Sequence, residues 1–301
     1  IEIGDRKKAI IKTIQKLVRG DILLVAGKGH ENSQEINGRH LNFDDAKIAS
    51  EEIFNGKFGS AKQILIEEFL EGEEMSYFIA TDGINYKFFG SAQDHKRVGE
   101  GDTGKNTGGM GCYSPSRLLS KDLELKIKTK IIEPTLNAIN KSGGVYKGFL
   151  YVGLMIKNDE PFLIEFNVRM GDPECQTILP LLATDLLDLI LSCCDETLES
   201  QDILWERKKS ICVVLCSNGY PDIYKKNVEI PNIENIKNND SFFIYHAGTE
   251  KKDNKVYANG GRVLNFVSIS NNFKISDSQL MYFPSLKFSS MTLIFVSNSI
   301  N

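Results

Sequence analysis

The sequence of 301 residues lacks long apolar runs and any excess of basic residues. No hydrophobic stretch approaches the length that spans a bilayer, and no positively charged leader with a cleavage site begins the chain. We therefore expect neither a membrane protein nor a secreted one. The net charge of −4 gives no reason to expect a nucleic-acid partner. With 41% hydrophobic and 25% charged residues, the composition is typical of a globular protein, which we expect in the cytoplasm.

The sequence also lacks the cysteine and histidine spacings of a metal site. Its six cysteines include no C-x-x-C pair, and Cys193 and Cys194 lie within an apolar helical run. The four histidines are scattered along the chain. We therefore expect free thiols in a reducing compartment, without disulfides and without a zinc site.

The first 50 residues have the pattern of the end of an α/β domain. Apolar residues at helical spacing predict a helix over 5–18, and a short apolar run at 22–26 is typical of a buried strand. The Asn37–Gly38 pair predicts a hairpin, and Asp44 is placed to cap a helix over 45–54.

After residue 56 the pattern changes to strand pairs mixed with helices, which favours α+β layering over a regular βαβ series. A turn is expected at 82–85. A helix should begin after Ser120, bend at Pro134 and end at Gly143–Gly144. Two further helices are expected, at 175–183 and 184–194. Strands are expected at 64–70, 75–81, 86–92, 148–156, 161–169, 210–216, 241–248 and 260–269.

The glycine-rich stretch 99–111, "GEGDTGKNTGGMG", imitates two phosphate-binding patterns. Gly99, Gly101 and Gly104 satisfy G-x-G-x-x-G, but the residues before them are polar and those after them are too glycine-rich to open a helix. A Walker A loop would need Ser or Thr where Asn106 stands. The remaining readings are a surface loop without function and, as we prefer, a loop whose backbone N–H groups approach an anion.

The stretch 161–174, "PFLIEFNVRMGDPE", places polar residues along a strand. Because side chains alternate on a strand, Glu165, Asn167 and Arg169 should point to one face. A carboxylate beside an amide oxygen suits Mg²⁺, and the turn that follows presents Asp172 and Glu174. A solvated strand face with a surface ion pair is the alternative.

A second acidic stretch, "IEEFLEGEE" at 66–74, crowds five glutamates at the end of a strand. A solvated charge run is the usual explanation of such a pattern. The alternative is the rim of a nucleotide pocket, where backbone groups contact the adenine edge and a glutamate binds the ribose hydroxyls.

Three motifs in this order resemble one family of enzymes: "IEEFLEGEE", "QDHKRVGEGDTGKNTGGMGCYSP" and "IEFNVRMGDPE". They are similar to the phosphoribosylamine–glycine ligases (glycinamide ribonucleotide synthetases) of purine biosynthesis. The later "YHAGT" and "NGGRVL" resemble the C-terminal domain of that family, and the likeness extends over about residues 52–270. It implies an ATP-grasp fold in which the nucleotide lies between two α+β lobes.

The resemblance implies a carbon–nitrogen ligase that uses ATP and Mg²⁺ or Mn²⁺. ATP would phosphorylate the carboxylate of glycine, and the amine of phosphoribosylamine would attack the resulting acyl phosphate. The partners would be these small molecules, and the protein would be a monomer. Such catalysis is mainly positioning and charge neutralisation, which fits a sequence without an evident Ser or Cys nucleophile.

The resemblance also assigns residues to four groups. The metal ligands would be Glu165 and Asn167. The residues around the nucleotide would be Glu67, Glu68, Phe69, Leu70, Glu74, Gly108, Gly109 and Gly111. The catalytic residues would be Asp94, Lys96, Arg97, Arg169 and Asp172. The substrate-binding residues would be Glu174, Gly260, Gly261 and Arg262.

Residues 1–50 resemble another protein, the C-terminal end of the Mur ligase that adds the third amino acid to UDP-MurNAc-Ala-Glu. In "GKGHE", Gly27 and Glu31 would contact the incoming amino acid. This segment lacks that enzyme's ATP loop and central domain. The junction with the glycine-ligase part falls within 44–59, where the ligase family has a lobe that binds the ATP phosphates, so we expect Mg–ATP binding to be weak or absent.

The expected fold is thus mixed α+β and α/β, a partial ATP-grasp fold with a β-rich C-terminal domain behind a partial Rossmann-like Mur segment. We expect boundaries at 1–50 (Mur-like), 51–195 (ATP-grasp), 196–270 (C-terminal domain) and 271–301 (unassigned). The last segment, rich in Ser and large apolar residues, is an aggregation-prone tail or a stretch outside its native frame. Three alternatives stay open: a glycine ligase, truncated or chimeric; an inactive fusion; and a Mur fragment with appended sequence.

Overall fold

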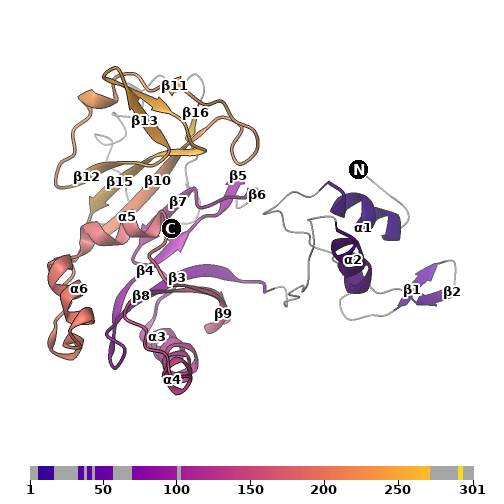
Figure 1. Ribbon diagram of the computed structural model, residues 1–301, viewed down its shortest axis with the longest axis horizontal. Coiled ribbons are helices and arrows are strands. Elements are labelled where there is room, and N and C mark those ends of the chain that lie inside the picture. Colours follow the sequence, from indigo (N-terminus) through magenta and orange to yellow (C-terminus); the bar gives the residue numbers. More distant parts are fainter. Residues whose placement is uncertain are drawn as a thin grey trace. The chain divides into compact units, whose positions relative to one another are not determined.

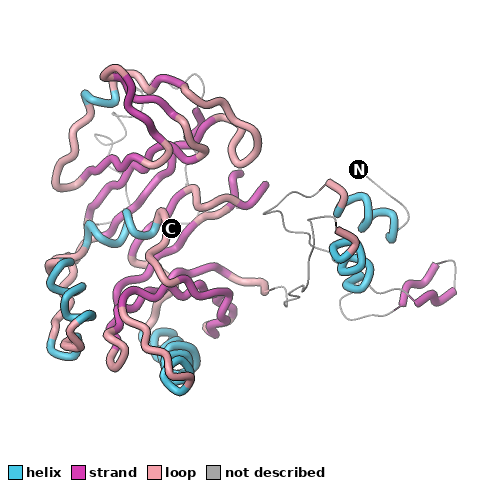
Figure 2. The backbone as a smooth tube through the Cα atoms, in the orientation of Figure 1, coloured by secondary structure: helices cyan, strands magenta, loops and turns pink. Residues whose placement is uncertain are grey.

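The computed structural model describes residues 6–16, 33–36, 39–42, 45–56, 70–99, 103–271 and 291–293 (Figures 1 and 2). The chain divides into two compact units, Ile1–Phe69 and Leu70–Asn301, and each is described by itself. In the described ranges, no helix has the length and apolar character needed to cross a membrane.

The first unit contains the two helices and the hairpin that the sequence predicts. Helix α1 (Arg6–Ile14) buries Ile10 and Ile14 and contacts helix α2 (Asp45–Phe54). Strands β1 (Ser33–Ile36) and β2 (Arg39–Asn42) pair antiparallel, so the expected hairpin is confirmed. The strand expected at 22–26, Gly27, Glu31 and the cap at Asp44 lie outside the described residues.

The second unit is built on one large sheet, whose described strand pairings are all antiparallel (Figure 1). Its strand order is β12-β15-β10-β7-β4-β3-β8-β9, and β16 (Met291–Leu293) also pairs with β10. The strands are β3 (Glu73–Thr81), β4 (Tyr86–Asp94), β7 (Gly111–Ser114), β8 (Gly148–Lys157), β9 (Glu160–Asn167), β10 (Lys209–Ser217), β12 (Phe242–His246) and β15 (Arg262–Ser270).

All these strands except β7 and β16 were expected from the sequence, and the predicted α+β layering is confirmed. The short strands were missed: β7, the hairpin of β5 (Arg97–Gly99) and β6 (Thr103–Asn106), and the small sheet β11-β14-β13 (Val228–Glu229, Lys255–Ala258 and Thr249–Lys252). The large sheet continues through the expected boundary between 195 and 196, since β7 pairs with β10. The positions of the domain boundaries stay a prediction.

The predicted long helix is present as α3 (Lys121–Ile127), the π-helical turn η1 (Lys128–Ile132) and α4 (Glu133–Lys141). Ser120 caps its start, because its Oγ accepts a hydrogen bond from the Leu123 amide at 3.1 Å. The wide turn η1 precedes Pro134, which has no backbone N–H to donate to the regular series of helical hydrogen bonds. Gly143, with φ +81°, ends the helix as expected.

Helices cover the two faces of the sheet around β3. On one face, Tyr77 and Val152 pack with Leu123 and Ile127 of α3. On the other, Phe78 packs in a cluster with residues of α5 (Glu174–Ile178) and α6 (Leu186–Cys194). The alternation along β3 therefore assigns its even-numbered residues near Ser76 to the α5 face. A third core underlies the C-terminal strands, with Leu215 and Phe266 at its centre.

The turn between β3 and β4 is organised by one buried carboxylate. Asp82 is fully buried and accepts hydrogen bonds from the amides of Ile84 (2.9 Å), Asn85 (2.6 Å) and Leu198 (3.2 Å). Burial by itself raises the pKa of Asp82, but these hydrogen bonds outweigh it and lower the pKa below its usual value. The charged form of Asp82 thus ties the expected 82–85 turn to the segment after α6.

We predict that Asp82→Ala lowers the free energy of unfolding by about 1–3 kcal/mol, because it leaves buried amide donors unpaired. Urea unfolding at neutral pH measures this, and Asp82→Asn, which keeps one acceptor oxygen, should lose less. Since the folded-state pKa is lowered, the stabilisation is present above the unfolded pKa and is lost as pH falls through the folded value. An Asp82→Ala effect that persists unchanged in acid would contradict the role of the charge.

Candidate functional site

The strand register brings the predicted metal pair onto the α5 face of the sheet. Ser76 of β3 pairs with Gly153 of β8, and Gly153 pairs with Glu165 of β9. Tyr151 of β8 pairs with Asn167. Because directly paired residues point to the same side, Ser76, Glu165 and Asn167 share one face.

Glu165 and Asn167 lie in contact, as the strand alternation predicts. The Asn167 side-chain amide donates to Glu165 Oε1 at 3.0 Å. Gly153 makes room for Glu165: a Cβ at that glycine would lie 3.3 Å from Glu165 Cγ and 3.4 Å from the Tyr151 hydroxyl. The pair therefore presents a carboxylate and an amide oxygen above β8, in reach of Tyr151.

Arg169 lies beyond the end of this strand, so the expected strand face does not extend to it, and its expected catalytic role stays a prediction. Strand β9 ends at Asn167, and a register shift within it separates Leu163 from Glu165. The exposed Arg169 guanidinium donates to the carbonyl of its neighbour Met170 at 2.9 Å. The strand stops because the chain turns toward Asp172 and Pro173, and alternation no longer applies beyond that point.

Glu174, at the start of α5, is almost completely buried, at 3% exposure, on the same face. Ser76 Oγ donates to Glu174 Oε1 at 2.8 Å and also lies 3.3 Å from the Tyr151 hydroxyl. A Cβ at Gly171 would lie 2.2 Å from Glu174 Oε2, so a side chain at that position would displace this carboxylate. Burial raises the pKa of Glu174, while its hydrogen bonds act in the opposite direction.

Asp94 ends β4 beside this carboxylate. Its Oδ1 is buried and has no hydrogen-bond partner within the described part of the chain. Burial raises the pKa of Asp94 well above its usual range, and the neighbouring charge of Glu174 raises it further, against the influence of Lys96. Continuing the β3–β4 register beyond Ser76↔Ala92 places Glu74 opposite Asp94.

Lys96 supplies the positive charge of this group and forms an ion pair with Glu74 at 2.8 Å. Burial lowers the pKa of Lys96, but Glu74 and other acidic neighbours more than compensate, so the pKa is raised and the ammonium stays charged. One ammonium thus faces three carboxylates: Glu74, Asp94 and Glu174. The α5 face thus holds more carboxyl groups than this ammonium can pair with, and burial disfavours the charged forms of Asp94 and Glu174.

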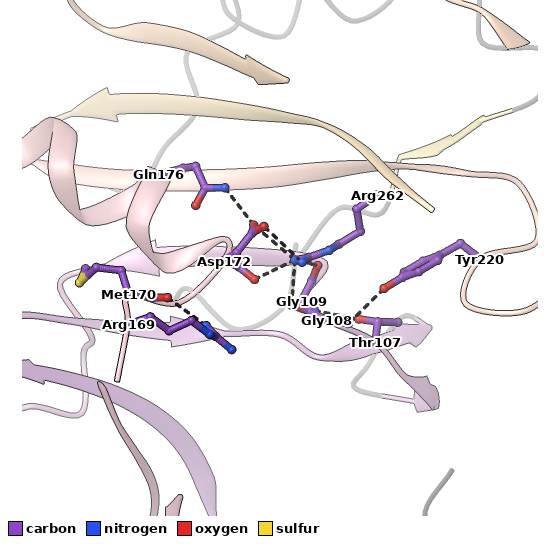
Figure 3. Close-up of polar contacts among 9 residues, drawn as sticks. All are labelled: Thr107, Gly108, Gly109, Arg169, Met170, Asp172, Gln176, Tyr220 and Arg262. Carbon is purple, nitrogen blue, oxygen red and sulfur yellow. Dashed lines mark hydrogen bonds and ion pairs between the residues drawn. The ribbon is translucent and has the colours of Figure 1, made fainter. Parts of the chain in front are cut away.

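The glycine turn 107–110 lies against this cluster and is held by polar contacts (Figure 3). Thr107 Oγ1 donates to the Lys96 carbonyl at 2.7 Å and accepts from the Gly109 amide at 3.0 Å. The Gly108 amide donates to the Tyr220 hydroxyl at 3.1 Å, and the Met110 amide donates to the His95 carbonyl at 2.8 Å.

These contacts show how the glycine-rich stretch is held within the protein, and its expected role at the nucleotide stays a prediction. The amides of Gly108 and Gly109 are satisfied within the protein, so they do not form an open cradle for an anion, and Gly111 lies in strand β7. The exclusion of Rossmann and Walker A loops is confirmed, because hairpin β5–β6 rather than a helix follows. Residues 100–102 lie outside the described part.

The residues expected to bind substrate from the C-terminal part also contact the protein itself. The Arg262 guanidinium Nη1 donates to the carbonyls of Asp172 (2.7 Å) and Gly108 (2.8 Å), and Nη2 lies 3.3 Å from Asp172 Oδ2 (Figure 3). The Gly260 carbonyl accepts from Ser217 Oγ at 2.8 Å. A Cβ at Gly261 would lie 2.3 Å from the Tyr220 ring. These residues therefore build the site's frame.

The other expected residues are distributed as follows. Asp172 is half-exposed and accepts from Gln176 Nε2 at 2.9 Å. Arg97 lies in hairpin β5–β6 and donates to the Gly104 carbonyl at 3.2 Å. Leu70 begins the second unit. The expected adenine-contacting residues Glu67, Glu68 and Phe69 lie outside the described residues.

Sequence reasoning missed the neutral members of the site. Ser76 and Tyr151 stand in apolar strands, and Thr107 and Tyr220 in turns, so only their strand register and contacts reveal them. All six cysteines are free, as predicted. No group of three or more His, Cys, Asp or Glu suited to a metal occurs among the described residues. Any metal on Glu165 and Asn167 would need further oxygen ligands from water or phosphate.

Comparison with known proteins decides the family. The family model for "Phosphoribosylglycinamide synthetase, ATP-grasp (A) domain" matches residues 7–175, more than half of the chain, and that for the C domain of the same synthetase matches residues 210–282. The chain belongs to the phosphoribosylglycinamide synthetase family. The resemblance drawn from the sequence motifs is thereby confirmed.

Individual relatives agree with this assignment. A phosphoribosylamine–glycine ligase of Pasteurella multocida is 45% identical over 227 residues, which is 74% of this chain and 52% of the relative. One from Leptospira interrogans serovar Lai is 40% identical over 277 residues, 90% of this chain and 62% of the relative. The chain thus spans between half and two thirds of the length of these relatives.

A solved structure supports the fold. The crystal structure of phosphoribosylamine–glycine ligase from Thermotoga maritima superimposes with a TM-score of 0.70 at 26% identity, covering 95% of this chain and 71% of that one. The predicted ATP-grasp fold is therefore confirmed. The Mur ligase resemblance of residues 1–50 is not confirmed, and the family match already begins at residue 7.

We predict that Gly109→Ala destabilises the protein by roughly 2–5 kcal/mol, from left-handed backbone strain and overpacking together. Gly109 has φ +113°, and a Cβ there would lie 2.6 Å from Pro173 Cδ and 2.8 Å from Asp94 Oδ1. Gly143→Ala is the matched control, since Gly143 has φ +81° but nothing within 4 Å of the added Cβ. It should cost only about 1–2 kcal/mol in urea unfolding. Equal losses in the two variants would contradict the close packing at Gly109.

Proposed function

We propose that the α5 face of the sheet is the metal- and substrate-binding part of a phosphoribosylamine–glycine ligase. The reaction joins glycine to 5-phosphoribosylamine, with ATP converted to ADP and phosphate. The observation that carries this proposal is the placement of the Glu165–Asn167 pair on the same sheet face as the buried carboxylates Asp94 and Glu174.

The donor set of Glu165 and Asn167 fits Mg²⁺ or Mn²⁺. Both supply hard oxygen ligands, and the hydrogen bond between them orients the two side chains. The Asn167 amide nitrogen faces Glu165 Oε1, which leaves Asn167 Oδ1 and Glu165 Oε2 as the candidate ligand atoms. A metal there neutralises charge on the phosphates of ATP when both are bound.

The buried carboxylates suit the amine chemistry of the reaction. A primary ammonium group would balance the excess negative charge of Asp94, Glu174 and Glu74 beside Lys96. Because the pKa values of Asp94 and Glu174 are raised, this pair can also accept a proton at a higher pH than an ordinary carboxylate. We assign Asp94 and Glu174 to the binding of the amine and to the removal of its proton on attack.

The remaining assignments follow from the same proposal. Glu67, Glu68, Phe69, Leu70 and Glu74 would border the adenine and ribose. Arg97, Arg169 and Asp172 would face the substrates from the rim of the site, where Arg97 and Arg169 are exposed. The protein would act on small molecules in the cytoplasm as a monomer, without nucleic-acid or membrane partners.

We predict Mg²⁺-dependent ATP binding that Glu165→Gln weakens at least about tenfold, equivalent to roughly 1.4 kcal/mol. The amide keeps the shape of the side chain but removes the charge that the metal requires. Titration calorimetry with and without Mg²⁺ measures the effect. Glu229→Gln is the matched control, because Glu229 pairs with Lys255 at the surface of the C-terminal part.

Each outcome of this experiment bears on a different part of the proposal. A Mg²⁺ dependence of ATP affinity that is unchanged in Glu165→Gln would remove Glu165 from the metal site. Absence of ATP binding in the wild-type chain would contradict the ATP site itself. Release of ADP that requires both glycine and phosphoribosylamine would establish the ligase reaction directly.

A further inference from the structure

Arg262, at the start of β15, joins two segments that are far apart in the sequence (Figure 3). Its Nη1 donates to the carbonyl of Asp172 at 2.7 Å and to that of Gly108 at 2.8 Å. Its Nη2 forms an ion pair with the Asp172 carboxylate at 3.3 Å. One planar guanidinium therefore holds the glycine turn 107–110 to the turn that precedes α5.

The glycine turn packs between Asp94 and the Asp172–Pro173 turn that leads into Glu174. A Cβ at Gly109 would touch both Pro173 Cδ, at 2.6 Å, and Asp94 Oδ1, at 2.8 Å, so the Gly109 backbone fills the space between them. Glu174 directly follows Pro173. Any shift of the glycine turn therefore changes the separation and the solvation of Asp94 and Glu174.

Tyr220, from the same C-terminal part, also contacts Gly108. The Gly108 amide donates to the Tyr220 hydroxyl at 3.1 Å, while the Gly108 carbonyl accepts from Arg262. Both polar groups of Gly108 are thus bound by residues that follow β10. Arg262 is also in close contact with Gly108, because a Cβ there would lie 3.1 Å from its Cζ.

We propose that Arg262 is a positioning residue that fixes the glycine turn against the Asp172–Pro173 turn and so holds Asp94 beside Glu174. Arg262 sets the geometry of the carboxylate pair rather than binding an anionic substrate. Tyr220 supports it by contacting the same turn. The inference rests on the proposed function only for the substrate that the carboxylate pair would bind. Its test does not depend on ligase activity.

The bonding of Arg262 supports positioning over anion binding. Its side chain is only 21% exposed, and its donors are directed at three backbone carbonyls, those of Gly108, Gly109 and Asp172, and at the Asp172 carboxylate. A substrate phosphate at Arg262 would have to compete with the Asp172 carboxylate. The fork geometry of a guanidinium reaches several acceptors at once, which a lysine ammonium on a flexible stem does not reproduce.

The charged and titratable groups around the pair define what the test must separate. The groups around Asp94 are Glu174 of α5, Lys96 and Glu74 on the β3–β4 side, Arg262 of β15, and the thiols of β7 and β10. The groups around Glu174 also include Tyr151 and Asp172. Removing the charge of Arg262 changes the titration of Asp94 by electrostatics alone. Variants that keep the charge but alter the contacts are therefore the informative ones.

The experiment follows the side-chain carboxyl signals of Asp94 and Glu174 by NMR across a pH titration of the full chain, with hydrogen exchange of the Gly109 amide. Arg262→Lys keeps the charge and loses the fork, and Tyr220→Phe removes one hydrogen bond and no charge. We expect both to shift the two carboxyl titrations and to speed Gly109 exchange about tenfold. Lys255→Met, which breaks a surface ion pair with Glu229, should change neither.

Two results would overturn the proposal. One is that Arg262→Lys and Tyr220→Phe titrate like the wild-type protein, which would leave Arg262 with an electrostatic effect only. The other is that inorganic phosphate or ribose 5-phosphate binds the wild-type chain with shifts at Gly108 and Gly109 that Arg262→Lys abolishes, which would make Arg262 a ligand-binding residue. Should Arg262→Lys fail to fold, Tyr220→Phe alone decides, since it leaves every charge in place.

Discussion

The candidate site depends on the backbone register of strands β3, β8 and β9. Hydrogen-bonded pairing sets Ser76 against Gly153 and Gly153 against Glu165, which places the acidic and amide side chains on the face opposite α3. A slip of one residue in β9 would exchange Glu165 and Asn167 with apolar neighbours and bury them against the helix. The apolar cluster around Val152 and Ile127 opposes that slip, so core packing and site geometry are fixed by the same pairing.

Glycines at three positions allow the carboxylates on this face to lie close together. Gly153 and Gly171 leave the space into which the Glu165 and Glu174 side chains fold, and Gly109 allows the glycine turn to approach Asp94. Burial disfavours the ionised forms of Asp94 and Glu174, and neighbouring negative charges add to this effect, which explains their raised pKa values. In the described part of the chain, these three glycines thus allow close approach of backbone and side chains.

The sequence predicts the long strands, the capped helix at Ser120 and the shared face of Glu165 and Asn167, because these depend on periodicity and local chemistry. It does not predict strand β7, whose four residues carry too little pattern, nor the end of β9 before Arg169. The partners of Arg262 were also beyond it, since Gly108 and Asp172 lie 154 and 90 residues away in the chain. Contacts of that kind are decided by tertiary packing, which single-residue preferences do not encode.

Strand β7 has a consequence for how the site forms. It pairs with β4 on one side and with β10 on the other, so the sheet is completed only when residue 112 meets residue 212. Strands this distant in sequence lose loop-closure entropy before their contacts stabilise the sheet, and sheets that depend on such pairings fold slowly. The α5 face is therefore expected to acquire its final shape late in folding, after the local hairpins of β3 with β4 and β8 with β9 have already formed.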